Sequence, residues 1–259
     1  MSASAAPAAR PAVGALPHLA PGSCQVWWID TDEVHAGHDD LLDPDDVVRR
    51  GRLHRPADRR RTTAAWAVAR LVLGGLAGLP PEALRIDRTC LACGGGHGKP
   101  RLLGDVGLHV SVSHAGNRAV VAVGRDAPVG VDIEQVGAWA DADLTDVARL
   151  VLAPEERAVL ARQPAGTRAE VFTTYWTRKE AAVKATGAGL SAPLDDIVVS
   201  SPAFPPHLLR WGAGNGDVPA PSLAALAAPA GFVGTVAVLG PAAPRVVEHD
   251  AGPLLRRCG

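Results

Sequence analysis

The sequence predicts an α+β fold. Runs of strand character, rich in β-branched and aromatic residues, mix with segments of helical periodicity, and no regular strand–helix–strand alternation connects them. One strand-like run passes through an Ala-Gly-Asn turn directly into a second, as an antiparallel hairpin does. With 259 residues, the chain is long enough for one large domain or two small ones, each with its own core.

The first expected elements are a disordered leader, a strand and two helices. Residues 1–23 are rich in Ala and Pro, and the prolines interrupt the unbroken apolar segment of roughly 7–15 residues that a secretory signal needs. The strand begins at Cys24, in CQVWWID. A short helix opens near Asp43, where Pro44 suits the first turn, and a longer helix over 58–76 has apolar residues at helical spacing.

The rest of the chain predicts four more strands and two helical segments. The hairpin covers 108–124, in LHVSVSHAGNRAVVAVG, and another strand follows at 128–136, in PVGVDIEQV. A helix broken near Pro154 precedes a long helix over 167–185 that ends at glycines. After a Pro- and Gly-rich stretch, GFVGTVAVLG at 231–240 predicts the last strand.

Composition excludes several classes of protein. The net charge is −1 and the pI is near 6.8, so there is no overall basic field to attract nucleic acid. No apolar run reaches the ~20 residues that cross a bilayer. The four cysteines form one close pair and two distant single residues, unlike a secreted disulfide framework. We expect a cytoplasmic protein with neither a nucleic-acid nor a membrane partner.

Two acidic residues alternate in the strand GVDIE. Asp132 and Glu134 share one face of the strand, and their carboxylates can bind a divalent cation such as Mg²⁺. Taken alone, this pattern favours the simpler alternative, a strand with a polar outer face.

The segment WTRKEAAVK is unusual because it contains two of the three lysines in a chain with 26 lysines and arginines. Lys99 is the third. Trp176, Glu180 and Lys184 lie at i, i+4 and i+8, on one side of the predicted helix. Glu180 can complete a metal site or act as a base, and Lys184 can neutralise phosphate charge. The alternative is an ordinary surface Glu–Lys pair worth ~0.2–0.5 kcal/mol.

Three other segments contain residues that can bind ligands. Ser113 and His114 end the first hairpin strand, where they can contact phosphate, but no acid at a suitable spacing indicates a serine-nucleophile triad. The segment 49–61 holds seven arginines in thirteen residues, and one or two of them can bind phosphate while the rest form a solvated helix face.

The segment CLACGGGHGKP contains Cys90, Cys93 and His97 in the pattern C-x2-C-x3-H. A structural zinc site typically has four ligands, and the sequence shows no second pair of Cys or His residues at a similar spacing. Zinc is therefore the less favoured interpretation, and the glycines with Lys99 indicate a flexible loop that approaches an anion.

Taken together, the segments HGKPRL, VSVSHAGN, VGVDIE and YWTRKEAAVKATGAGL resemble the surfactin-type 4'-phosphopantetheinyl transferases. The signatures of that family are a G-x-D-x-E strand and a W-x-x-K-E-x-x-x-K helix about 45 residues apart, and both are intact at 130–134 and 176–184. The resemblance covers about residues 45–200.

The resemblance implies two α+β halves related by pseudo-twofold symmetry, each a small antiparallel sheet packed with helices, and coenzyme A in the cleft between them. The expected boundaries are a disordered leader at 1–23, an N-terminal half at 24–126, a C-terminal half with the metal site at 127–245 and a tail at 246–259. Two halves in one chain imply a monomer.

The implied activity is transfer of the 4'-phosphopantetheine arm of coenzyme A to a serine of an apo acyl or peptidyl carrier protein. The products are holo carrier protein and 3',5'-ADP, and the metal is Mg²⁺, with Mn²⁺ as the alternative. Two rival functions stay open: a Mg²⁺-dependent phosphohydrolase or nuclease, and a non-catalytic module that binds carrier protein or zinc.

The resemblance also assigns residues. Asp132, Glu134 and Glu180 bind the metal, and Lys184 offsets charge on the departing phosphate. Because the carrier serine must lose a proton, we expect Glu180 to be the general base, directly or through a metal-bound water. The residues implied to contact coenzyme A are Arg52, Arg61, Lys99, Ser113, His114, Lys179 and Lys184. Glu155 matches a further carboxylate near the metal, and Arg49 stands where the family often has lysine.

Carrier proteins of this kind are usually acidic helical bundles. We therefore expect the carrier to dock on the segment 157–174, which lies between two site motifs and contains Arg157, Arg162 and Arg168.

Overall fold

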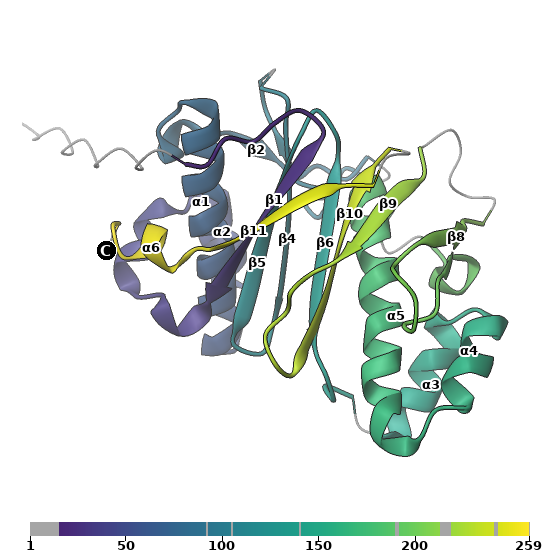
Figure 1. The fold of residues 1–259 in the computed structure, drawn as a ribbon. Helices are drawn as coiled ribbons and strands as arrows, with labels where there is room; N and C mark the ends of the chain where they lie inside the picture. Colours follow the sequence, from purple (N-terminus) through teal and green to yellow (C-terminus); the bar gives the residue numbers. More distant parts are fainter. Residues whose placement is uncertain are drawn as a thin grey trace, which may run out of the picture.

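Two β-sheets pack face to face between two long helices (Figure 1), and the described residues also form a third sheet of two short strands. The computed structural model of the chain describes residues 16–91, 93–104, 106–139, 141–189, 192–212, 219–240 and 243–258. Three apolar clusters separate its four layers, two of them between a sheet and its helix and one between the sheets. This arrangement of small sheets packed against helices confirms the predicted α+β class.

The larger sheet has six strands, in the order β11-β1-β5-β4-β3-β2. Their bounds are β1 Ser23–Asp30, β2 Ile86–Asp87, β3 Arg101–Leu102, β4 Leu108–Ala115, β5 Arg118–Arg125 and β11 Arg245–Asp250. β4 and β5 form the predicted hairpin, and Gly116 in its turn has a φ of 52°, in the left-handed region that glycine tolerates. β11 pairs parallel with β1 although some 220 residues separate them, so the C-terminal segment returns to the first sheet.

The helix α2 (Pro56–Ala77) covers the outer face of this sheet. Its run of alanines, valines and leucines is buried against β1, β4 and β5, and Gly78 ends it in the left-handed conformation. The helix α1 (Pro44–Gly51) begins as predicted, because the Asp43 side chain accepts a hydrogen bond from the Asp46 backbone at 2.7 Å.

The smaller sheet has three antiparallel strands, β6 (Val129–Gln135), β10 (Phe232–Leu239) and β9 (Pro221–Ala225). The helix α5 (Ala165–Thr186) packs on its outer face (Figure 1). Gly130 permits this close packing, because a Cβ there would lie 2.1 Å from the Ala181 carbonyl oxygen. The strand is thereby held directly against the helix that carries the second signature.

The remaining elements are short. They are the helices α3 (Asp141–Val151), α4 (Pro154–Ala161) and α6 (Gly252–Leu255), the strands β7 (Val198–Val199) and β8 (Leu208–Arg210), and the 3-10 helices Thr31–Glu33, Ala36–Leu41, Pro81–Ala83 and Leu194–Asp196. α3 and α4 pack beside α5. None of the helices in the described parts of the chain combines the length and apolar character that a membrane span requires.

Two segments differ from the sequence-based expectation. The predicted disordered leader is too long, because Leu19 is only 1% exposed in the first core cluster and the Pro17 carbonyl accepts a hydrogen bond from Gln25. Residues 1–15 of that leader lie outside the described residues. The expected tail at 246–259 contains most of β11, which is part of the six-stranded sheet. The strands β8 and β9, inside the Pro-rich stretch, were not predicted.

Candidate active site

Two carboxylates of β6 form the start of the candidate site. Strand alternation turns Gly130, Asp132 and Glu134 toward α5, and it turns Val131 and Ile133 into the apolar cluster between the sheets. Asp132 is 3% exposed, whereas Glu134 is half-buried. The predicted alternation is therefore present, but the face that carries the acids is mostly covered by α5 and not by solvent.

A lysine and a serine hold the Asp132 carboxylate. Lys184 Nζ lies 2.6 Å from Asp132 Oδ1, and the Ser113 hydroxyl donates to the same oxygen at 2.9 Å. Lys184 Nζ also lies 3.3 Å from Ser113 Oγ. The other carboxylate oxygen, Oδ2, is buried and accepts no hydrogen bond from any described residue. A buried carboxylate oxygen without a donor is costly, so it marks a place where a cation is favoured.

Glu134 and Glu180 complete an acidic cluster with Asp132. Burial, followed by repulsion from Asp132, raises the pKa of both glutamates, and that of Glu134 reaches about 7. Glu180 also adds to the repulsion on Glu134, whereas Lys184 and a hydrogen bond from Trp176 lower the pKa of Glu134. The three carboxylates thus repel one another across the gap between β6 and α5.

The acidic cluster has the chemistry of a site for a hard divalent cation. Carboxylate oxygens are the ligands that Mg²⁺ and Mn²⁺ prefer. A bound cation would offset the repulsion among the three carboxylates, and it would give the buried Oδ2 atom of Asp132 a partner. The residues therefore fit the metal that the sequence predicts. The oxygen atoms of the three carboxylates are not yet as close together as metal ligands. Among the described residues, only Cys90, Cys93 and His97 bring three potential ligand atoms within 4.8 Å of one another.

Positive groups from the first sheet and α2 lie beside the cluster. The charges of Arg61 and Lys184 reach His114 and lower its pKa, after the larger effect of desolvation. Arg61 also donates to the Gly116 carbonyl at 2.7 Å and pairs with Asp58. His114, Arg61 and Lys184, predicted from separate motifs, are thus brought to the same region.

Lys99 does not have the environment that the sequence predicts for it. Its ammonium group donates to the carbonyls of Val129, Lys184 and Ala185, at 2.9, 2.8 and 2.5 Å. Burial without a carboxylate partner lowers its pKa to about 7. The lysine connects its loop to the start of β6 and the last turn of α5, so the predicted contact with coenzyme A is corrected to a structural role.

Lys179 points away from the acidic cluster. It is completely buried, pairs with Glu156 at 2.5 Å and donates to the carbonyls of Val151 and Leu194 at 2.7 and 2.9 Å. An ammonium group with three acceptors and no exposed surface cannot contact coenzyme A. The prediction for Lys179 is therefore wrong. Helical spacing puts Lys179 on a different face of α5 from Glu180, but it does not show that Glu156 of α4 packs against that face.

The carboxylates that begin α4 are also remote from the site. Glu155 is exposed and pairs with Arg210 at 3.0 Å. Glu156 is buried and accepts hydrogen bonds from the backbone of Ala153 and Val199. Both carboxylates are bound to other partners, so the further carboxylate expected near the metal at Glu155 lies outside the acidic cluster.

The basic segment 49–61 is mostly a solvated face. Arg52 is exposed at the end of α1, where nothing in the described structure opposes a phosphate contact. Arg49 donates to the Gly96 carbonyl, and Arg50 and Arg60 pair with acids. Of the seven arginines, Arg61 is the one that the structure brings to the charged groups around the acidic cluster.

Sequence reasoning missed how the strand of the first signature is held. The backbone N–H groups of Val131 and Ile133 donate to the hydroxyls of Ser111 and Ser113 on β4, at 3.1 and 3.3 Å. Ser113 therefore acts on Asp132 and its strand, and not primarily as a phosphate ligand. The available signal was the pair of serines at alternate positions, on the face of the strand opposite its leucine and valines.

Comparisons with known proteins agree with these motifs. Residues 128–222 match the family model described as the 4'-phosphopantetheinyl transferase superfamily. The 4'-phosphopantetheinyl transferase HetI of Nostoc sp. is 33% identical over 222 residues, which cover 83% of this chain and 87% of that protein. The 4'-phosphopantetheinyl transferase psf-1 of Bacillus pumilus is 34% identical over 140 residues, which cover 54% and 55%. The crystal structure of Thermotoga maritima holo-[acyl-carrier-protein] synthase aligns with 44% of this chain and 64% of that one, at 21% identity and a TM-score of 0.37.

Proposed function

The chain belongs to the 4'-phosphopantetheinyl transferase superfamily, and from this premise we propose that it transfers the 4'-phosphopantetheine arm of coenzyme A to a serine of an apo acyl or peptidyl carrier protein. The reaction depends on Mg²⁺ and releases 3',5'-ADP. The observation that carries the proposal is the acidic cluster of Asp132, Glu134 and Glu180 beside Lys184. In that cluster, a buried carboxylate oxygen has no donor among the described residues.

Asp132, Glu134 and Glu180 would hold the Mg²⁺ ion. When bound, the ion would offset the charge of the pyrophosphate of coenzyme A and act as Lewis acid and template for its displacement. Ser113 would keep the Asp132 carboxylate oriented, through the same hydrogen bonds that fix β6 against β4.

Glu180 is the proposed general base. The carrier serine must lose its proton as its oxygen attacks phosphorus, and a carboxylate accepts that proton more readily when its pKa lies above the ordinary value. Burial and the charge of Asp132 raise the pKa of Glu180 in the metal-free protein. A bound Mg²⁺ ion would offset the charge of Asp132, so the proposed role depends on the position of Glu180 in the acidic cluster. If Glu180→Gln retained near-normal turnover at saturating Mg²⁺, this role would be excluded.

Lys184 is the group proposed to offset the negative charge that builds on the departing phosphate. Its ammonium group is partly exposed, and it is already held by Asp132 and Ser113. An ammonium group is compact, whereas a guanidinium at the same position would crowd the carboxylates. Arg61, His114 and the exposed Arg52 are the proposed contacts of the phosphates of coenzyme A, since Lys99 and Lys179 are bound elsewhere.

We place carrier docking on the exposed end of α4 and the start of α5. Arg162 and Arg168 are exposed there, and Arg168 also donates to the Gln163 carbonyl. Charge reversal at Arg162 and Arg168 should weaken carrier binding and its salt dependence, and should leave coenzyme A binding unchanged. Arg157 is expected to contribute less, because it is half-buried and donates to carbonyls at the end of α3.

The deciding experiment is intact-protein mass spectrometry of an apo carrier protein after incubation with this protein, coenzyme A and Mg²⁺. We expect a mass gain of one phosphopantetheine arm, which EDTA and the Asp132→Ala substitution abolish. Glu155→Ala is the matched control, because it removes an exposed carboxylate outside the cluster and should leave the mass gain intact. Hydrolysis of coenzyme A without any carrier would instead favour a phosphohydrolase. No modification of several carrier classes would contradict the proposal.

A further inference from the structure

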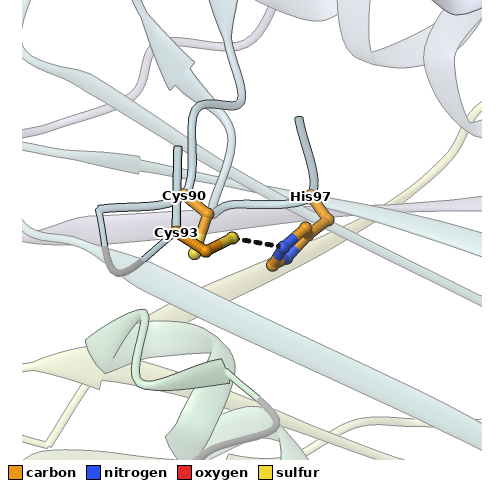
Figure 2. A group of neighbouring side chains, drawn as sticks. All are labelled: Cys90, Cys93 and His97. Atoms are coloured by element: carbon orange, nitrogen blue, oxygen red, sulfur yellow. Dashed lines mark hydrogen bonds between the residues drawn. The ribbon is translucent and has the colours of Figure 1, made fainter. Parts of the chain in front are cut away.

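The loop between β2 and β3 brings two cysteines and a histidine together. Ligand atoms of Cys90, Cys93 and His97 all lie within 4.8 Å of one another, and Cys93 Sγ is 3.0 Å from His97 Nε2 (Figure 2). Cys93 and His97 are exposed and Cys90 is half-buried. The sequence alone predicts a loop that approaches an anion here, because it offers no second pair of zinc ligands. The geometry now favours the other interpretation.

The loop backbone supports a site for thiolates. The Gly94 N–H donates to the Cys90 carbonyl at 2.8 Å, and the Cys90 N–H donates to the Gly95 carbonyl at 2.7 Å. The Gly95 N–H lies 3.4 Å from Cys93 Sγ, where it favours the charged form of the sulfur. Gly98 lets the two arms of the loop meet, because a Cβ there would lie 2.5 Å from the Thr89 carbonyl oxygen.

The distances suit a zinc ion. Bonds of about 2.3 Å to sulfur and 2.0–2.1 Å to nitrogen place tetrahedral ligands roughly 3.5–3.8 Å apart. The Cys93–His97 separation of 3.0 Å would thus need to open by only a fraction of an ångström. Two thiolates and one imidazole balance the charge of Zn²⁺, and such soft ligands do not suit Mg²⁺.

We propose that Cys90, Cys93 and His97 bind one zinc ion, with water as the fourth ligand. Binding forms two zinc–sulfur bonds and one zinc–nitrogen bond. Each thiol releases its proton to solvent, and no oxidation is involved. The site is separate from the acidic cluster and from the Mg²⁺ proposed there.

The zinc ion would fix a loop of the first sheet that contacts both α1 and α5. Within this loop, the Gly96 carbonyl accepts from Arg49 of α1, and Lys99 donates to carbonyls at the end of α5 beside Lys184. Holding Cys90, Cys93 and His97 in one place would therefore restrain both contacts. The role is structural, and the readout does not require transfer activity.

The first test is the zinc content of the untagged full chain, purified under reducing conditions and measured by mass spectrometry of the metal. We expect about one zinc ion per chain in the unmodified protein and in the control Cys258→Ser, and almost none in Cys93→Ser and His97→Ala. Circular dichroism checks that the variants fold. A zinc-free unmodified chain that also fails to take up added Co²⁺ would overturn the proposal. A Cys90–Cys93 disulfide in freshly isolated protein would do the same.

The second test measures the restraint. Removing zinc with 1,10-phenanthroline, which leaves Mg²⁺ in place, should speed amide hydrogen exchange in 88–99 and in the last turn of α5. The rest of α5 should be unchanged. Equal exchange with and without the chelator would refute the structural role.

Discussion

Lys179 and Lys184 show how residues of one motif can serve different ends. Both lie in α5, and sequence reasoning assigned both to phosphate. Lys179 is buried against Glu156 at 2.5 Å, whereas Lys184 is partly exposed beside Asp132. The scarcity of lysine in an arginine-rich chain drew attention to two residues that each pair with a buried carboxylate, but it did not distinguish a buried structural pair from a reactive group.

The two lysines should therefore respond differently to substitution. Lys179→Met leaves the Glu156 charge buried and unpaired, which should lower the free energy of unfolding by about 3–5 kcal/mol. Lys184→Gln can still donate to Asp132, so the loss of stability should be about 1 kcal/mol or less. Its transfer rate should fall by roughly 10²–10³. Urea unfolding and a transfer assay on both variants separate the roles, and the opposite pattern would contradict our assignment.

Glu134 should make the metal-free protein less stable as the pH rises. Its pKa is about 7 in the folded protein, against 4.5 as the ordinary value. Between these values, the unfolded chain loses the proton while the folded chain keeps it, so the free energy of unfolding falls as the pH rises from about 4.5 to about 7. The effect is at most about 3 kcal/mol, and less because the side chain is partly solvated.

Unfolding in urea with EDTA between pH 4.5 and 8 measures this dependence. Glu134→Gln should flatten the curve, and Glu170→Gln, at an exposed position on α5, should not. Mg²⁺ binds the ionised cluster, so its affinity should rise over the same pH range. A Glu134→Gln curve as steep as that of the unmodified protein would exclude Glu134 as the source.

At the scale of elements, the sequence was informative where the signal is local. Helical periodicity predicted α2 and α5, and alternation predicted the β4–β5 hairpin, β6 and β10 within a few residues. It also placed Asp132, Glu134 and Glu180 correctly on their faces. The strands that escaped prediction are very short, as are β2, β3, β7 and β8, or lie in Pro-rich segments, as do β8 and β9, and β11 pairs with a strand at the other end of the chain. Pairing over such distances leaves no local periodicity to read.

The contact between β6 and α5 depends on a glycine. In Gly130→Ala, the new Cβ would lie 2.1 Å from the Ala181 carbonyl oxygen and 2.3 Å from the Ala185 nitrogen, so strand and helix must separate. We expect a loss of roughly 1–3 kcal/mol or more in stability. A larger loss of transfer activity should accompany it, because Asp132 and Glu134 move relative to Glu180.

Gly166→Ala is the matched control for this substitution. Gly166 also lies in the β6–α5 layer, in the first turn of α5, but nothing lies within 4 Å of a Cβ there. Its stability should stay unchanged or rise by up to about 1 kcal/mol. Thermal unfolding tests both variants, and the transfer assay compares Gly130→Ala with the unmodified protein, because Gly166 lies on the proposed docking surface. A Gly130→Ala protein as stable as the control and as active as the unmodified protein would show that the close packing does not position the site.

At the scale of the whole molecule, the C-terminal segment closes the chain on its first sheet. β11 pairs with β1, the Glu248 carboxylate accepts from the Trp28 indole at 2.6 Å, and Leu255 is fully buried in the first core cluster. The first sheet is thus built from both ends of the chain, while the segment between them forms the second sheet and α5. We infer that the two layers unfold together.

Leu255→Ala tests this inference. Loss of a fully buried leucine side chain should lower the free energy of unfolding by about 2–5 kcal/mol. Val247→Ala, on the exposed side of β11, should cost less than about 0.5 kcal/mol. If the layers unfold as one cooperative unit, Leu255→Ala should speed slow amide exchange in β6 and β10 as much as in β4 and β5. Faster exchange confined to β4 and β5 would show that the first sheet opens alone, and that the acidic cluster on β6 and α5 survives without the positive groups of the first sheet.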